Sequence, residues 1–153
     1  MKKRTNIFLR CFALILVLAL MTPTAAMAAT QPEIQPLAAD YIATADAYMT
    51  AEGDGKVRVY FSVYGMQTLA ELGVVSIVVQ RYHINARNSF VNYQVYRYEN
   101  YPELMGHNTM VHGGYVEFQG TPYTVYRAYV SFRATKNGEI DTQNLMCDPV
   151  QAR

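Results

Sequence analysis

The sequence feature that most constrains the fold is an alternating stretch between Gly120 and Ala134. Residues two apart along a strand point to the same face, so an apolar period of two indicates a strand with one buried and one outward face. Tyr, Val, Thr and Phe also suit a pleated surface. We predict that this stretch is the central strand of a β-sandwich. Its inward residues are Tyr126, Ala128, Val130, Phe132 and Ala134.

Six further segments carry patterns that predict strands, separated by turn signals such as Asn137-Gly138. Good helix formers over 66–72 end at Gly73, which predicts one helical turn between two strands. In the segment 90–98, Val91, Tyr93 and Val95 are expected to face inward and alternate with Asn92, Gln94 and Tyr96, which are expected to face outward. In the segment 56–64 the apolar odd positions, Val57, Val59, Phe61 and Val63, are likewise expected to share one face, with the even positions on the other. The six expected strands cover residues 41–49, 56–64, 74–82, 90–98, 109–118 and 140–147.

Seven strands with all prolines outside them predict an all-β fold, a single immunoglobulin-like or fibronectin-III-like antiparallel β-sandwich of about seven strands. A single up-and-down barrel is the alternative. The chain has no Trp, and its two cysteines include one in the N-terminal apolar run, so an antibody-type core is excluded. Tyr126 is a candidate tyrosine corner whose hydroxyl reaches back to the preceding turn; otherwise it only fills core volume.

The N-terminus has the three parts of a secretory signal peptide. Four basic residues precede or flank an apolar run over 11–21, and a small-residue tract follows it up to Ala28. The run is shorter than the ~20 residues that span a bilayer, so we expect cleavage after Ala28 and no retained membrane segment. We expect the mature protein to be secreted and extracellular.

These signals divide the chain into a signal peptide (1–28), a flexible leader (29–39) and a β-sandwich domain (40–150). After cleavage nine basic residues face twelve acidic ones, a net charge of −3 with His neutral. Nucleic-acid binding depends on neutralising phosphates, so this balance argues against a nucleic-acid partner. Cys147 is the one cysteine left, either an incidental thiol or, less favoured at a chain end, the link of a disulfide dimer.

Four groups of residues match one known family in type and spacing: Leu69-Ala70-Glu71-Leu72-Gly73 with Ser76-Ile77, Met105-Gly106-His107-Asn108-Thr109, His112-x-Gly114-x-Val116, and Gly120-Thr121 with Tyr126-Arg127-Ala128. Together they resemble a family of small secreted proteins of Gram-positive (Firmicutes-type) gut bacteria that has no assigned function. The resemblance implies a signal peptide followed by one β-sandwich, and it lends no catalytic residue. The chain departs from the family by carrying Tyr, Val and Arg where the family has Ser, Thr and Lys on exposed faces.

Residues that could carry chemistry are scattered. His107 and His112 are five apart, but no Cys or acidic residue stands at a ligand-like interval, so we predict no metal. His112 is in phase with Gly114 and Val116, which predicts a half-buried structural histidine bonded to backbone. No paired carboxylates and no serine nucleophile motif are recognisable, so we predict no catalytic residue and no cofactor.

Tyrosine is the compositional anomaly, with thirteen residues. Tyr and Arg are enriched at interfaces because they combine a large contact area with a polar tip; the alternative is that Tyr is simply a good strand former. We expect a secreted, non-enzymatic binding module for an unknown glycan or cell-envelope protein. A self-associating structural protein with an uncapped sheet edge is the second hypothesis, and a secreted hydrolase the third. The candidate binding residues are Tyr60, Tyr64, Tyr96, Tyr98, Tyr129 and Arg127.

Overall fold

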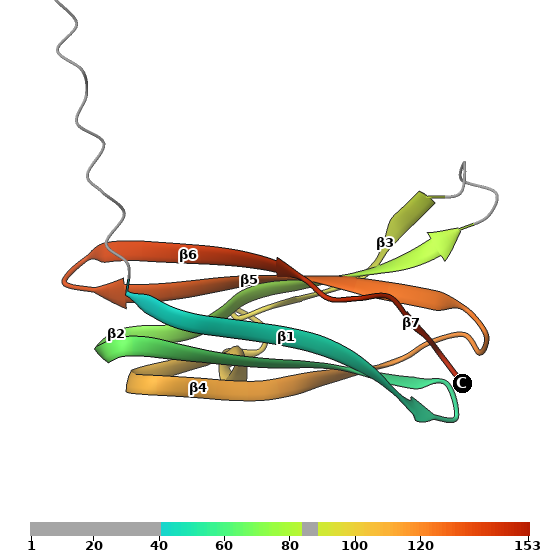
Figure 1. The fold of residues 1–153 in the computed structure, drawn as a ribbon, viewed down its shortest axis with the longest axis horizontal. Coiled ribbons are helices and arrows are strands. Elements are labelled where there is room, and N and C mark those ends of the chain that lie inside the picture. The colour runs from blue at the N-terminus through green and yellow to red at the C-terminus, as the bar shows by residue number, and fades with distance from the viewer. Residues whose placement is uncertain (1–40, 84–88) are drawn as a thin grey trace, which may run out of the picture. The chain divides into compact units, whose positions relative to one another are not determined.

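The computed structural model describes residues 41–83 and 89–153, which form an all-β fold, a curled antiparallel sheet (Figure 1). The predicted signal peptide and leader lie outside the described residues. The elements are β1 (Ile42–Gly53), β2 (Lys56–His83), β3 (Ser89–Arg97), the 3-10 helix η1 (Pro102–Leu104), β4 (Met105–Gln119), β5 (Val125–Lys136), β6 (Glu139–Met146) and β7 (Val150–Gln151).

The long strand β2 connects the whole sheet. Its first part, 56–64, pairs with β1 on one edge and with β4 on the other. Its last part, 76–81, pairs with β5 on one edge and with β3 on the other. The main path is β1-β2-β5-β6, and β7 pairs with β5. The stretch that we predicted as the central strand is β5, which does lie between two neighbours, but β2 has the larger share of the pairing.

The predicted helical turn over 66–72 is wrong, because these residues continue β2. The register of β2 slips against β4 between Tyr64 and Leu69, and against β5 between Val74 and Ser76. Irregularities of this kind bend a strand and increase its twist. Residues with good helix propensity therefore lie where β2 bends, and pairing with two neighbours outweighs that propensity.

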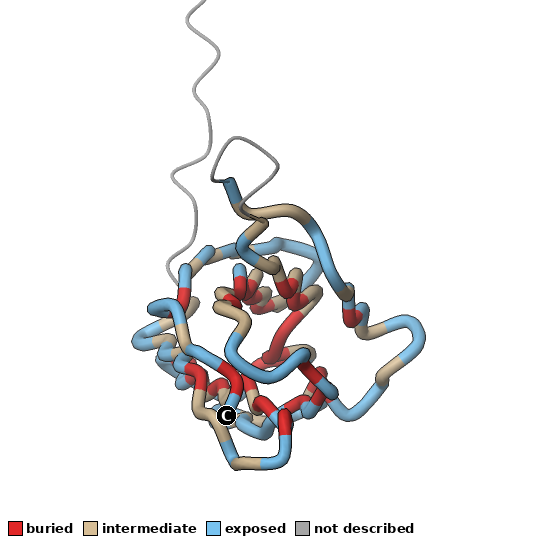
Figure 2. The backbone as a smooth tube through the Cα atoms, turned by 90° about the vertical axis from the view of Figure 1, so that its right-hand side faces the viewer, coloured by how far each residue is buried: buried red, intermediate tan, exposed pale blue. Residues whose placement is uncertain are grey.

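The hydrophobic core lies inside the curl, where Figure 2 shows most of the buried residues. The even positions of β5, from Tyr126 to Ala134, are completely buried, which confirms the predicted period. The odd positions of the first part of β2, from Val57 to Val63, are buried as predicted. Gly114 is exposed but lies against this core, since a Cβ there would lie 3.2 Å from the Phe61 ring.

The predicted phase of β3 is wrong in its second half. The register of β2 with β3 shifts between Val79 and Gln80, whose partners Gln94 and Asn92 leave out Tyr93. One extra residue turns every side chain beyond it to the other face. Tyr96, predicted to point outward, is therefore only 4% exposed, while Val95, predicted inward, is 40% exposed.

Side chains join the edge strands of the curled sheet at two seams, one between the start of β1 and β6 and the other between β3 and β4. At one seam the Asp141 carboxylate on β6 accepts hydrogen bonds from the backbone N–H groups of Tyr41 and Ile42, at 2.8 and 2.9 Å. At the other seam the hydroxyls of Tyr93 and Tyr96 on β3 donate to backbone carbonyls of β4, at 2.8 and 2.9 Å. A carboxylate thus satisfies N–H groups at one edge, and phenols satisfy C=O groups at the other.

The C-terminal residues also close one end of the core. The Ala152 N–H donates to the Thr124 carbonyl at 3.0 Å, and the Gly55 N–H donates to the Arg153 carbonyl. Nearby, the hydroxyl of Tyr126 accepts a 2.8 Å hydrogen bond from the Thr121 N–H in the turn before β5. The chain end and this turn are therefore tied to the same part of the fold.

Candidate binding face

Three tyrosines form a row across β1, β2 and β4. Tyr48 opposes Tyr60 in the register of β1 and β2, and Tyr60 opposes Tyr115 in that of β2 and β4. Opposed residues of antiparallel strands project to the same face and contact one another. The Tyr48 and Tyr60 rings stack at 5.1 Å with an interplanar angle of 14°, and the Tyr60 and Tyr115 rings lie 5.6 Å apart at 44°. We call these three residues the tyrosine row.

Core packing fixes the backbone under the tyrosine row. Tyr60 lies between the buried Val59 and Phe61. Met49 and Val116, which follow the other two tyrosines in the chain, are buried as well. Tyr48 and Tyr115 are 51% and 52% exposed, so the row presents about half of its outer rings to solvent. Its rings are therefore both exposed and anchored.

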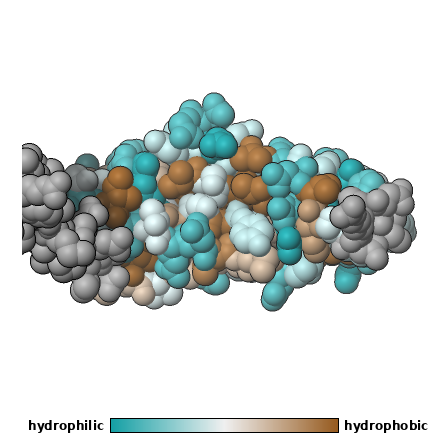
Figure 3. Space-filling view, turned by 90° about the horizontal axis from the view of Figure 1, so that it is seen from above, coloured by the Kyte–Doolittle hydropathy of each residue, from teal (hydrophilic) through white to brown (hydrophobic). Residues whose placement is uncertain are grey.

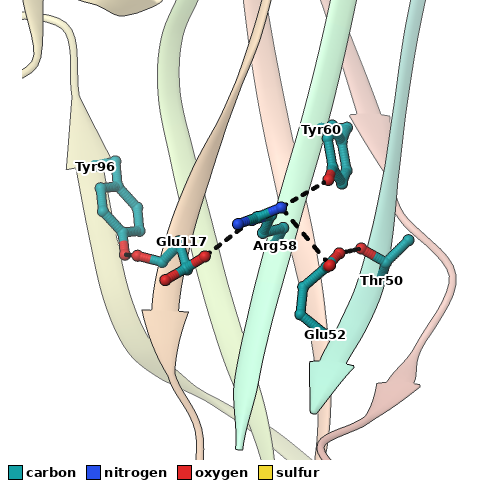
Figure 4. Close-up of polar contacts among 6 residues, drawn as sticks. All are labelled: Thr50, Glu52, Arg58, Tyr60, Tyr96 and Glu117. Atoms are coloured by element: carbon teal, nitrogen blue, oxygen red, sulfur yellow. Dashed lines mark hydrogen bonds and ion pairs between the residues drawn. The ribbon is translucent and has the colours of Figure 1, made fainter. Parts of the chain in front are cut away.

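A charged network joins one side of the tyrosine row (Figure 4). The Nε atom of Arg58 donates to Glu117 Oε2 at 2.8 Å, and Nη1 donates to the Tyr60 hydroxyl at 3.4 Å. Nη1 also lies 3.6 Å from Glu52 Oε2, and the Thr50 hydroxyl donates to the other oxygen of that carboxylate. The Tyr60 hydroxyl and the Glu117 carboxylate both raise the pKa of Arg58.

The guanidinium of Arg58 also lies 4.8 Å from the centroid of the Tyr115 ring. Arg58 therefore contacts two members of the row, one by a hydrogen bond and one by a cation–π interaction. Exposed ion pairs stabilise a fold only slightly. What this network contributes is the positioning of the Tyr60 and Tyr115 rings and the pairing of two nearby carboxylates with one guanidinium.

Short side chains lie on the other side of the tyrosine row. Asp46 opposes Ser62, and Ser62 opposes Gly113, two residues further along the strands. We call Asp46, Ser62 and Gly113 the shelf. Beyond it lie Tyr64 and Val111, which are opposed and both about half exposed. The shelf is thus a line of small residues between two lines of larger ones.

The predicted binding residues do not form one site. Tyr60 and Tyr64 lie on the face just described, while Tyr129 lies on β5. Tyr98 is partly buried against the core and contacts the Arg133 guanidinium at 4.8 Å. Tyr96 is buried and donates to the Glu117 carbonyl. The sequence indicated outward tyrosines but not which strands lie side by side.

Tyr48, Tyr115 and Arg58 were not among the predicted binding residues. Each stands within a predicted strand, and Arg58 and Tyr115 stand at positions whose expected direction is outward, so part of the signal was available. What brings them together is the register of three strands that are distant in sequence, and no short pattern encodes that register.

A second outward face carries a more apolar row over β6, β5, β2 and β3. Tyr129 opposes Met146 on one side and Val78 on the other, and Val78 opposes Val95. We call these four residues the apolar row. Figure 3 looks down on the molecule from above the view of Figure 1 and shows hydrophobic side chains at the surface between hydrophilic ones.

Arg127 belongs to this second face and is engaged within the protein. Its Nε donates to Gln80 Oε1 at 2.8 Å, and its guanidinium lies 4.1 Å from the Phe90 ring centroid and 5.6 Å from that of Tyr129. Arg127 therefore contacts a member of the apolar row, Tyr129, as Arg58 contacts two members of the tyrosine row.

The histidines offer no metal centre in the part of the chain that the structure describes, where no three His, Cys, Asp or Glu side chains are grouped for a metal. His112 Nε2 lies 3.0 Å from the Glu103 carbonyl oxygen, and its ring is 5.9 Å from that of Phe61. His107 is exposed and opposes Glu71. His112 thus bridges β4 to the residues before it.

Cys147 lies in the core, with 1% of its surface exposed. Its N–H donates to the Ala128 carbonyl at 2.9 Å, which holds it beside β5. Burial raises the pKa of the Cys147 thiol to about 11, and the carboxylates of Asp46 and Asp148 add to this effect. The thiol is therefore inaccessible at the folded surface and poorly nucleophilic at neutral pH.

No known protein family model matches the chain, and no curated protein matches it. Within residues 41–83 and 89–153, no helix is long and apolar enough to cross a membrane.

Proposed function

We propose that this protein is a secreted, non-enzymatic recognition module that binds an extracellular ligand through the tyrosine row. The observation that carries the proposal is the alignment of Tyr48, Tyr60 and Tyr115 across three strands, with outer rings half exposed. The N-terminal sequence pattern supports secretion.

Preorganisation supports a binding role for this face. Immobilising a flexible side chain at an interface costs about 0.5–1.5 kcal/mol, and a side chain already held in place avoids much of that cost. Stacking between Tyr48 and Tyr60, and the contacts of Arg58 with Tyr60 and Tyr115, hold the rings before any ligand arrives. Tyr and Arg are also, together with Trp, the residue types enriched among those that contribute most of the binding energy at interfaces.

The test compares the parent chain with the double variant Tyr48→Ser/Tyr115→Ser on a glycan array and on cell-envelope preparations. Tyr123→Ser is the matched control, because Tyr123 is 82% exposed and lies outside the face. Binding by the parent and the control, with loss in the double variant, supports the proposal. Binding that is equal in all three places the site elsewhere. Urea unfolding of each variant establishes that the fold is intact.

The second candidate function is self-association, and the apolar row is the observation that favours it. Side chains pin the two edges of the sheet at the seams, so an outward face is a better surface for a second copy than an edge. Sedimentation velocity over a range of concentrations tests it, with Val95→Ser/Met146→Ser as the variant. Concentration-dependent assembly that the variant abolishes supports this function over the first.

We also infer that the strands of the curled sheet are arranged in two packed layers, as in a β-sandwich. One layer consists of β1, β4 and the first part of β2, and the other of β6, β5, β3 and the last part of β2. Strands that pass between layers do so through bends and bulges, and the register slips of β2 supply such a bend. Hydrogen exchange that protects the two layers to different extents would support this division.

A further inference from the structure

We infer that the ligand of the tyrosine row is a neutral, hydroxyl-rich polysaccharide whose chain crosses β1, β2 and β4 over the shelf. This inference rests on the proposed function and names the ligand class for the same face. The observations that carry it are the charge balance of the face, its unused hydrogen-bonding groups and the direction in which the row runs.

The face is close to neutral. Its outward charged side chains are two basic and three acidic ones: Lys56, Arg58, Asp46, Glu52 and Glu117. Two of the three carboxylates already pair with Arg58. A polyanion needs a cluster of unpaired cations to neutralise its charge, and a strongly cationic partner needs an excess of anions. Neither excess is present, so a neutral ligand fits the face best.

The polar groups of the shelf and of the tyrosine row beside it can exchange hydrogen bonds with hydroxyls. The hydroxyls of Tyr48, Tyr115 and Ser62 and the carboxylate of Asp46 have no hydrogen bond to another described residue. Phenols and serine both donate and accept, and a carboxylate accepts. A sugar hydroxyl also does both, so each of these groups finds a complementary partner on a glycan at little electrostatic cost.

The shape suits an extended polymer. The ring centroids of the tyrosine row are 5.1 and 5.6 Å apart, which is comparable to the length of one pyranose unit in an extended chain. The shelf follows the row in the same cross-strand direction, and Gly113 contributes no side chain to it. A chain lying there would contact ring edges and phenol hydroxyls on one side and Tyr64 and Val111 on the other. Amphipathic sugar rings match such a mixture of apolar edges and polar tips.

The test is native affinity electrophoresis of the full chain in gels that contain one polymer each. Soluble β-1,4-glucan and galactomannan are the neutral probes, polygalacturonate and heparin the anionic ones, and polylysine the cationic one. The variants are Tyr48→Ser/Tyr115→Ser and Ser62→Gln, which puts a longer neutral side chain on the shelf, with Tyr123→Ser as the control. Asp46→Asn removes the carboxylate of the shelf.

Retardation by a neutral polysaccharide is expected, with binding about tenfold weaker in the double variant and in Ser62→Gln and unchanged in the control. Asp46→Asn and added salt should change it little, because no net charge is neutralised. Neutral binding that the tyrosine and Ser62 variants leave intact overturns the inference. Retardation only by polylysine or a polyanion, lost in the double variant, overturns it but leaves the recognition function standing. No binding to any polymer, array or envelope preparation overturns both.

Discussion

The carboxylate of Asp141 accepts a 2.8 Å hydrogen bond from the backbone N–H of Tyr41, 100 residues earlier in the chain. The same oxygen accepts a second hydrogen bond, at 2.9 Å, from the N–H of Ile42. The hydroxyl of Tyr41 donates to Glu139, two residues before Asp141. These contacts tie the start of β1 to β6, so the two edges meet through side chains where no strand ladder joins them.

Replacing Asp141 should therefore loosen the start of β1. We expect Asp141→Ala to lower the free energy of unfolding by about 2 kcal/mol, because it leaves two half-buried N–H groups without a charged acceptor. Asp141→Asn keeps one acceptor oxygen and should cost about half as much. Urea denaturation measures both, and the exposed Asp148→Ala is the control. An Asp141→Ala variant as stable as Asp148→Ala would contradict the role of this contact.

The sequence was most informative about features that depend on one strand or one turn alone. The alternation in β5 and in the first part of β2 predicted the buried faces correctly, since period two follows from strand geometry alone. The Asn137-Gly138 signal marks the turn between β5 and β6, where both residues have positive φ. Local chemistry decides such features, and local sequence therefore reports them.

The errors concern features that depend on distant pairing. Segments 56–64 and 74–82, predicted as separate strands, belong to one strand, and the short β7 was not predicted. The strand count of seven agrees only because these two differences offset each other. The phase of β3 depends on one extra residue at Tyr93, which alternation cannot reveal. The tyrosine row likewise exists only through the register of three strands.

The hydrogen bond from the Thr121 N–H to the hydroxyl of Tyr126 can be tested with one atom removed. We expect Tyr126→Phe to lower the free energy of unfolding by about 1 kcal/mol, since the N–H loses its acceptor. The ring contacts with Tyr93 and Phe118, both 5.2 Å between centroids, should persist. Thermal and urea unfolding measure the change, with Tyr123→Phe as the control. Equal stability of Tyr126→Phe and the parent would show that the ring alone matters.

The buried thiol of Cys147 should make the folded protein less stable at alkaline pH. Burial raises the pKa of this thiol from its ordinary value of 9.0 to about 11, so the folded state holds the proton more tightly than the unfolded state. The stabilisation is complete below pH 9 and is lost as the pH rises towards 11, at up to about 1.4 kcal/mol per pH unit. The stability of Cys147→Ala should fall less steeply across this window.

The comparison between the parent and Cys147→Ala cancels other groups that titrate at high pH. One of these is Tyr96, whose pKa burial raises to about 12. The thiol should also react slowly with a thiol reagent at neutral pH and fully in urea. Parallel stability curves for the two proteins, or rapid labelling of the native state, would contradict the buried thiol.

Gly73 is the glycine where an added methyl group should lower the free energy of unfolding most. It pairs with Met105 on one side and Arg133 on the other, and a Cβ there would lie 2.3 Å from the Leu104 carbonyl oxygen and 2.8 Å from the Met105 Cα. Both are backbone atoms, which cannot turn away as a side chain can. We expect Gly73→Ala to cost about 3 kcal/mol, at the upper end of typical overpacking.

Two controls separate this clash from other effects of losing a glycine. At Gly138 a Cβ would meet nothing within 4 Å, but φ is +86°, so Gly138→Ala reports backbone strain alone and should cost about 1 kcal/mol. Ser76→Ala, on the same strand as Gly73, should change stability by no more than about 0.5 kcal/mol. Urea denaturation ranks the three variants. A Gly73→Ala variant as stable to urea as Gly138→Ala would contradict this prediction. It would mean that β2 and the start of β4 can move apart at little cost, and that their close approach does not help to hold the curl of the sheet.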